Sequence, residues 1–181
     1  MVERNPGVLG GNKLKLGIFG SNCSGGLAFT KLPERWDGSW DGNERLAALA
    51  DQVGFECMVP IARWRGFGGA SNVNSLSWET LTWATGLLAK TSKITVFGTV
   101  HAPMVHPVFA AKQMVTADHV GRGRFGLNIV CGWNKSEFDM FGVEALAHDL
   151  RYKYGEEWFN VVKSTWTARE PQDYTSEFFD L

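Results

Sequence analysis

The chain has 181 residues, with 18 Lys or Arg against 19 Asp or Glu and a formal net charge of −1. This balance argues against a nucleic-acid-binding protein, because such proteins usually carry a basic excess on one face. Hydrophobic residues make up 44% of the chain, which is enough to bury a core. No apolar run approaches the roughly 18 residues of a membrane-spanning helix. The first residues hold no apolar signal core, so we expect a cytoplasmic protein without membrane association.

Strand-length apolar segments alternate with amphipathic segments along the whole chain. Strands are expected at residues 14–19, 55–61, 94–100 and 124–131. Helices are expected at residues 43–53, 77–89, 106–120 and 149–168. Asn43 is expected to cap the first helix and Ser77 to open the second, whereas Gly54 and Gly121 end the first and third.

The order of these segments predicts an α/β fold with a parallel sheet and right-handed crossovers. No G-x-G-x-x-G sequence follows the first strand, so a dinucleotide-binding fold is not favoured. A (β/α)8 TIM barrel fits the alternation better, but such barrels take roughly 200 to over 400 residues. We therefore expect only the first four βα units, with residues 1–181 as the N-terminal half of a barrel, cut or naturally truncated. Residues 1–12 are expected to be flexible.

In parallel α/β folds, function lies in the loops that follow the strands. The loop at residues 62–69 is rich in glycine and contains Arg63 and Arg65. It is either a ligand-binding loop, in which arginine holds an anionic or planar group, or a long surface loop. His101 and His106 follow the third strand. Their spacing is not that of a metal-binding pair on a helix, and no carboxylate lies nearby to complete a site, so we predict no metal site.

Asn128 and Arg151 are the other candidates that the residues themselves single out. Asn128 lies in an apolar strand, where its amide either pairs with another polar group inside the barrel or faces a bound heterocycle. Arg151 and Tyr152 begin the last helix, where an arginine beside free backbone N–H groups suits a phosphate. The alternative for Arg151 is a surface ion pair with Asp149 or Glu156. Cys131 ends a strand with no histidine near it in sequence, so we expect an inert, packed thiol.

Two longer motifs stand in the second half of the chain, GRFGLNIVCGWNKSEFDMFG at residues 123–142 and HDLRYKYGEEW at residues 148–158. They resemble motifs of the bacterial luciferase-like flavin monooxygenases, in the branch that holds the pyrimidine, dimethylsulfone and alkanesulfonate monooxygenases. The RGFGG segment at residues 65–69 resembles the pyrimidine enzyme, and Ser24-Gly25-Gly26 resembles the sulfone enzymes. Lys112, Gln113 and Asp118 lie in a helix of the type seen in this family. The resemblance extends over residues 14–181.

The resemblance implies a barrel that binds FMN at its carboxyl face. Reduced FMN would come from a separate NAD(P)H-dependent flavin reductase, and O2 would supply one oxygen atom to a small organosulfur or N-heterocyclic substrate. By matching positions, Thr99 and Asn128 would be the catalytic residues near the oxygen site, with Asn128 also contacting the flavin ring. The further flavin-binding residues would be Ala62 and Arg63 along the ring, Glu137 at the flavin or its loop, and Arg151 and Tyr152 at the phosphate. Arg63 stands where the pyrimidine enzyme has a lysine.

Two alternatives remain beside this interpretation. One is a deazaflavin-dependent oxidoreductase of the same superfamily, which moves hydride. The other is a non-catalytic half-barrel that binds flavin or only assembles with a partner. A half-barrel leaves its first and fourth strands as open edges, so we expect a homo-oligomer and no turnover by this chain alone.

Overall fold

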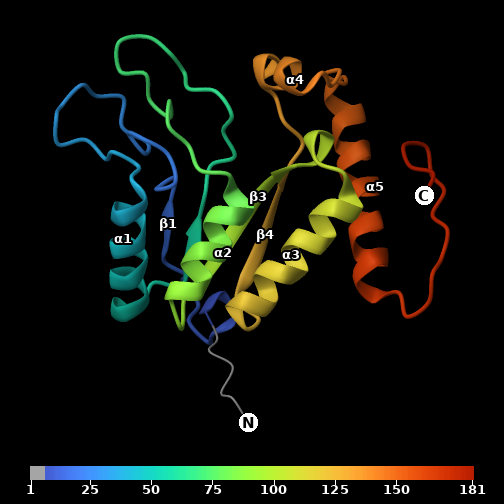
Figure 1. Cartoon of the computed structure of the whole chain (residues 1–181), viewed down its shortest axis with the longest axis horizontal. Coiled ribbons are helices and arrows are strands. Elements are labelled where there is room, and N and C mark those ends of the chain that lie inside the picture. The colour runs from blue at the N-terminus through green and yellow to red at the C-terminus, as the bar shows by residue number, and fades with distance from the viewer. Residues whose placement is uncertain (1–6) are drawn as a thin grey trace. The chain divides into compact units, whose positions relative to one another are not determined.

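The computed structural model describes residues 7–181 and contains one four-stranded sheet in the order β1-β2-β3-β4 (Figure 1). The β1–β2 and β2–β3 pairs are parallel. The strands are β1 (Gly17–Phe19), β2 (Cys57–Val59), β3 (Thr95–His101) and β4 (Phe125–Val130). The helices are α1 (Trp40–Val53), α2 (Thr80–Lys90), α3 (Pro107–Gly121), α4 (Lys135–Phe141) and α5 (His148–Thr167), with short 3₁₀ turns at Gly7–Leu9 and Ala102–Met104. The predicted α/β alternation is confirmed, and α4 is an addition that the sequence analysis did not predict.

The chain packs as two compact units. Unit 1 takes in the described residues up to Thr99 together with Thr116–Asn128, and unit 2 comprises Val100–Val115 and Ile129–Leu181. Of residues 1–12, which were expected to be flexible, residues 1–6 lie outside the described part of the chain. Residues 7–12 include the first 3₁₀ turn, and the Asn12 amide donates to Glu56 Oε1 at 2.7 Å. Their flexibility stays a prediction.

The core of unit 1 lies between the sheet and the helices α1 and α2, which run side by side in Figure 1. Its buried side chains come from both helices and from the neighbouring strands: Ala47, Ala50, Met58, Trp83, Ala84, Leu87, Leu88, Ile94 and Val96. The predicted β1 is shorter than expected because the chain before it bonds to a side chain. Leu16 N donates to the Glu56 carboxylate at 2.8 Å, so ladder pairing begins only at Gly17.

Two predicted helix starts are wrong. Helix α1 begins at Trp40, and Ser39 caps it by accepting from Gly42 N at 3.2 Å. Asn43 is buried inside the helix, where its amide donates to Ser39 O at 2.8 Å and accepts from the Trp83 indole at 3.0 Å. Helix α2 begins at Thr80 rather than at Ser77, with the Glu79 carboxylate as its cap. The predicted end of α1 at Gly54, in the left-handed conformation with φ 91°, is confirmed.

Asp51 ties the end of α1 to the turn between α2 and β3. Its carboxylate accepts hydrogen bonds from the backbone N–H groups of Ser92, Lys93 and Ile94 at 2.6–3.0 Å and from the Ser92 hydroxyl at 3.0 Å. Burial by itself raises the pKa of this carboxyl, but the hydrogen bonds outweigh burial and hold the pKa below its ordinary value. The ionised form is therefore the form that stabilises the fold.

We expect Asp51→Asn to lower the free energy of unfolding by about 1–3 kcal/mol near neutral pH, because an amide NH2 then faces backbone N–H donors. The folded pKa is depressed, so the stabilisation is complete above the unfolded pKa of roughly 3.9 and is lost as pH falls through the folded value. Urea midpoints of the wild type and the variant should therefore converge at acidic pH. Asp173→Asn, at an exposed carboxylate, serves as the control. A difference that persists unchanged at low pH would exclude the ionised carboxylate as its source.

Unit 2 is organised around α5. The Trp158 indole is buried and donates to Val105 O at 2.7 Å, and the Trp166 indole donates to Ala111 O at 3.2 Å. The segment after α5 folds back on it, since the Tyr154 ring packs against Phe178 and Phe179 with centroids 5.2 Å apart. None of the helices within residues 7–181 is long and apolar enough to cross a membrane.

Candidate functional site

The side chain of Asn22 extends the pairing of β1 with β2 beyond the strands themselves. Main-chain pairing reaches Gly20 N, which donates to Val59 O at 3.0 Å. Asn22 is completely buried, and its amide both accepts from Ile61 N and donates to Ile61 O, each at 2.8 Å. The amide thus holds the chain directly before Ala62. This role of Asn22 is not evident from the sequence, because a Gly- and Ser-rich loop gives no sign that one of its side chains is buried.

Arg63, one of the predicted flavin-binding residues, is fixed from two sides. The Ser77 hydroxyl donates to Arg63 O at 2.7 Å, which holds its backbone. The guanidinium carbon lies 4.4 Å from the centroid of the Phe67 ring, and Phe67 in turn lies 5.7 Å from the Phe29 ring. The loop at residues 62–69 is therefore ordered by specific contacts, and its arginine is stacked on an aromatic face. Both phenylalanines are exposed, so this stack borders solvent.

The structure brings Thr99 and Asn128 into direct contact. Asn128 Nδ2 donates to Thr99 Oγ1 at 3.1 Å, and Thr99 Oγ1 donates to Pro60 O at 2.7 Å. Thr80 Oγ1 donates to Thr99 O at 2.5 Å, which fixes the backbone of the same residue. Thr99 is buried and Asn128 is half-buried. The chain of bonds links the ends of β2, β3 and β4 within unit 1. The polar pair that was one of the two alternatives for Asn128 is thus present, and its role toward a flavin stays a prediction.

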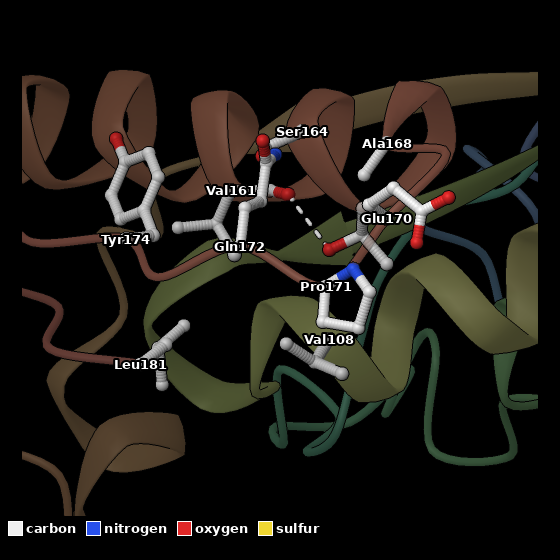
Figure 2. Close-up of a pocket in the computed structure, with 10 residues that line it drawn as sticks. Val108, Val161, Ser164, Ala168, Glu170, Pro171, Gln172, Tyr174 and Leu181 are labelled. Carbon is white, nitrogen blue, oxygen red and sulfur yellow. Dashed lines mark hydrogen bonds between the residues drawn. The ribbon is translucent and has the colours of Figure 1, made fainter.

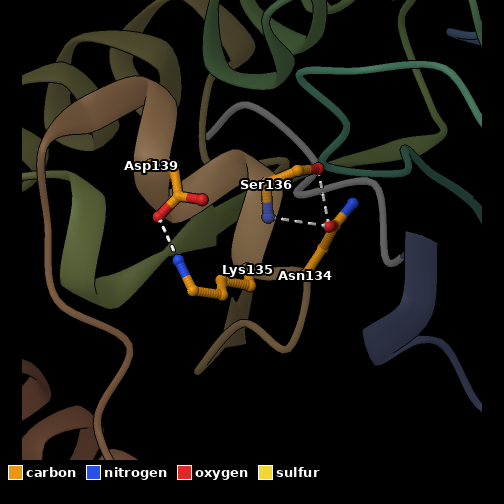
Figure 3. Close-up of polar contacts among 4 residues, drawn as sticks. All are labelled: Asn134, Lys135, Ser136 and Asp139. Atoms are coloured by element: carbon orange, nitrogen blue, oxygen red, sulfur yellow. Dashed lines mark hydrogen bonds and ion pairs between the residues drawn. The ribbon is translucent and has the colours of Figure 1, made fainter.

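In unit 2, Glu137 lies on α4, the helix that the sequence analysis did not predict. The Asn134 side chain caps this helix by accepting from Ser136 N at 3.2 Å and from the Ser136 hydroxyl at 2.8 Å (Figure 3). Lys135 and Asp139 form an ion pair at 2.6 Å on its exposed side (Figure 3). Glu137 is 2% exposed, so its carboxylate is held inside the fold rather than presented on the surface.

Arg151 reaches from α5 to the segment after β4, where its Nη1 donates to Gly132 O. Its Nε is buried and has no hydrogen-bond partner among the described residues. Asp149, the alternative partner that the sequence offers, instead pairs with its neighbour, its Oδ1 accepting from His148 Nδ1 at 2.8 Å. The guanidinium is therefore anchored by a carbonyl and keeps an unsatisfied, buried donor, which is the arrangement that an anionic group would complete.

The N-terminus of α5 adds further donors beside Arg151. Its first residue follows Ala147, which offers no side-chain cap to the free backbone N–H groups of the first turn. Tyr152 is 60% exposed, with its ring 5.0 Å from the His148 ring. An uncapped helix start with an arginine in its first turns attracts phosphate through both the helix dipole and hydrogen bonds. The residues present thus fit the phosphate of the flavin that the sequence analysis expected.

The cysteines take no part in these groups as reactive thiols. Burial raises the pKa of the Cys23 thiol to about 12, although Arg63 acts in the opposite direction. Burial also raises the pKa of Cys131, whose sulfur would lie 2.8 Å from a Cβ placed on Gly155. Gly155 therefore lets α5 pass close to this sulfur, and the expectation of a packed, inert thiol at Cys131 agrees with the structure.

A pocket of about 210 Å³ lies elsewhere in unit 2, between α5 and the segment that follows it (Figure 2). Its lining is Val108, Val161, Ser164, Thr165, Ala168, Glu170, Pro171, Gln172, Tyr174 and Leu181. Figure 2 shows Gln172 turned toward Ser164, with which it forms a hydrogen bond. None of the predicted site residues lines this pocket, and Glu170 is the one charged residue in its lining. The candidate site residues therefore lie at the strand ends and at the start of α5, outside this pocket.

Comparison with known proteins identifies relatives along nearly the whole chain. The family model for luciferase-like monooxygenases matches residues 15–181. The chain is 36% identical over 154 residues to the FMNH(2)-dependent dimethylsulfone monooxygenase of Pseudomonas putida, covering 85% of this chain and 41% of that protein. It is 30% identical over 171 residues to the pyrimidine monooxygenase RutA of Pseudomonas savastanoi pv. phaseolicola, covering 93% of this chain and 47% of that protein.

Solved structures show the same fold at lower sequence identity. The EDTA monooxygenase EmoA from Chelativorans sp. BNC1 superposes with a TM-score of 0.79 at 19% identity, over 94% of this chain and 46% of that one. Riboflavin lyase RcaE superposes with a TM-score of 0.81 at 21% identity, over 94% of this chain and 46% of that one. The chain thus spans about half the length of the relatives that it matches. On the family match, the chain belongs to the luciferase-like monooxygenases.

Proposed function

We propose that this chain carries part of the FMN-binding and oxygen-reacting site of a monooxygenase that uses reduced FMN. The observation that supports this most directly is the start of α5, where Arg151 has a buried, unsatisfied Nε beside an uncapped helix N-terminus. A dianionic phosphate satisfies both kinds of donor, whereas a neutral ligand satisfies neither well. The sequence relatives support the flavin itself, since the dimethylsulfone enzyme is named as FMNH(2)-dependent.

In this proposal the residues of unit 1 serve the flavin ring. Asn22 and Ser77 hold the backbone on either side of Ala62, so that Ala62 and Arg63 lie along the ring in a fixed conformation. Thr99 and Asn128 lie where oxygen reacts, and their mutual hydrogen bond sets their orientation. Neither side chain is a strong acid or base, so their role is to orient reactants and to donate or accept hydrogen bonds.

The residues of unit 2 serve the phosphate and its loop. Arg151 and Tyr152 bind the phosphate, and Glu137 orders the segment that contains α4 from its buried position. Reduced FMN, when bound, supplies the electrons that activate O2. The protein supplies binding, orientation and exclusion of water.

The substrate and partners are part of the same proposal. The named relatives act on dimethylsulfone and pyrimidines, which supports a small organosulfur or N-heterocyclic substrate. A separate NAD(P)H-dependent reductase would supply the reduced flavin. Homo-oligomer formation is included because β1 and β4 lie at the two edges of the sheet within the described residues, and open edges favour pairing with another chain.

Titration of the chain with FMN, riboflavin and the deazaflavin F420, followed by fluorescence, tests this proposal. We expect saturable FMN binding that is at least roughly tenfold tighter than riboflavin binding, because charge-assisted hydrogen bonds to phosphate add about 1.5–3 kcal/mol. Equal affinity for FMN and riboflavin would exclude the phosphate site at α5. Tighter binding of F420 than of FMN would favour the deazaflavin alternative, whose fold is shared by an F420-dependent secondary alcohol dehydrogenase with a TM-score of 0.74 at 19% identity.

A further inference from the structure

The hydrogen-bond chain from Asn128 through Thr99 to Pro60 has a fixed direction. The Pro60 carbonyl is purely an acceptor, so the contact of 2.7 Å requires Thr99 to donate its hydroxyl proton there. A hydroxyl has one proton, and Thr99 Oγ1 therefore meets Asn128 only as an acceptor. Thr99 is buried, so its hydroxyl cannot turn from Pro60 O to water without losing a hydrogen bond.

The direction of that chain decides how the Asn128 amide is turned. Its Nδ2 must face Thr99, 3.1 Å away, because an Oδ1 in this position would oppose another acceptor. Oδ1 consequently points away from Thr99, and among residues 7–181 the Asn128 side chain makes no other hydrogen bond. Asn128 is half-buried and lies in the carboxyl half of β4, and ligands of parallel α/β folds bind at the carboxyl ends of the strands. Oδ1 is therefore the acceptor that this side chain keeps for a ligand.

We propose that Thr99 sets the polarity of Asn128, so that the site offers an acceptor to a ring N–H and thereby selects the reduced flavin over the oxidised one. The inference rests on the proposed function. Reduction of an isoalloxazine places a hydrogen on a ring nitrogen that carries only a lone pair in the oxidised ring. An acceptor at this nitrogen stabilises the reduced ring and repels the oxidised ring. A freely turning amide would pair with either form and would select neither.

The test compares Thr99→Val, Thr99→Ser and Thr95→Val with the wild type. Thr99→Val removes the hydroxyl that orients the amide, Thr99→Ser retains it, and Thr95→Val is a matched change at a buried threonine of the same strand. Dissociation constants of oxidised and reduced FMN are measured without oxygen, together with the midpoint potential of bound FMN. We expect the wild type and the two control variants to prefer reduced FMN. In Thr99→Val the preference should fall roughly tenfold, as for one lost hydrogen bond between neutral groups.

Nitrogen-15 spectra of the Asn128 side-chain amide test the polarity without flavin. We expect these signals to shift in Thr99→Val and to stay in place in Thr99→Ser. Equal affinity of the wild type for both forms of FMN, or an unchanged preference in Thr99→Val, overturns the inference. If the wild type binds neither form, the proposed function of this chain fails. In that case unchanged Asn128 signals in Thr99→Val overturn the polarity itself, and shifted signals support it.

Discussion

Replacing Arg124 by alanine is expected to lower the free energy of unfolding by about 3 kcal/mol or more, and thus by a large part of the stability of a typical domain. The buried guanidinium donates four hydrogen bonds at 2.8–3.0 Å, to the carbonyls of Leu88, Thr91 and Ile94 and to the Thr91 hydroxyl. Two of these carbonyls belong to the last turn of α2 and its cap, where a cation also complements the helix dipole. Alanine leaves the carbonyls without donors and opens a cavity.

Urea denaturation followed by circular dichroism measures this change. Arg124→Lys keeps the charge but places one donor group where the planar guanidinium has several, so we expect an intermediate loss. Arg45→Ala removes an exposed arginine from α1 and should change the free energy of unfolding by less than about 0.5 kcal/mol. Burial lowers the pKa of Arg124 from its ordinary value. Equal stability of Arg124→Ala and Arg45→Ala would show that these buried bonds contribute nothing net.

Arg151→Ala is expected to weaken FMN binding roughly 10- to 100-fold and to leave riboflavin binding almost unchanged. Charge-assisted hydrogen bonds are worth about 1.5–3 kcal/mol, and riboflavin lacks the phosphate that would receive them. The bond from Nη1 to Gly132 O orients the guanidinium before any ligand arrives, and its buried Nε keeps an unused donor. This preorganisation reduces the entropy that binding would otherwise cost.

Lys153→Ala is the matched control, since Lys153 is a cation on the same helix that forms an ion pair with Glu177. Its removal should change FMN and riboflavin affinities equally and slightly. The measurement is the ratio of the two dissociation constants for each variant, with thermal melts to confirm that each variant is folded. A parallel loss of FMN and riboflavin affinity in Arg151→Ala would assign Arg151 a structural role through Gly132 instead.

Part of the motif that carries the family resemblance proves to be structural. Arg124, in the Gly-Arg pair at its start, serves the end of α2. Asp118, singled out in the preceding helix, accepts from Phe125 N at 3.3 Å and so fixes the start of β4. The sequence pattern marks these positions as firmly as Asn128 or Arg151. Only the hydrogen-bond partners separate residues that hold the sheet from residues that we propose bind the flavin.

The sequence by itself determined the order of the strands and of every helix except α4, the left-handed end of α1 at Gly54, and the arginine at the start of α5. These features depend on local periodicity and on capping preferences, which act over a few residues. A polar partner for the half-buried Asn128 was one of two alternatives that the sequence left open, because a polar group in an apolar strand must find a partner.

Only the tertiary structure decided which partners the polar groups take. Ser39 rather than Asn43 caps α1, because Asn43 is used to bind the Trp83 indole 40 residues away. Asn22 joins Ile61 across 39 residues, and Arg124 reaches Ile94 across 30. A side chain that could form several hydrogen bonds pairs with the donors and acceptors that have no other partner in the packed fold. Those groups are brought near it by contacts between distant segments, which no local pattern encodes.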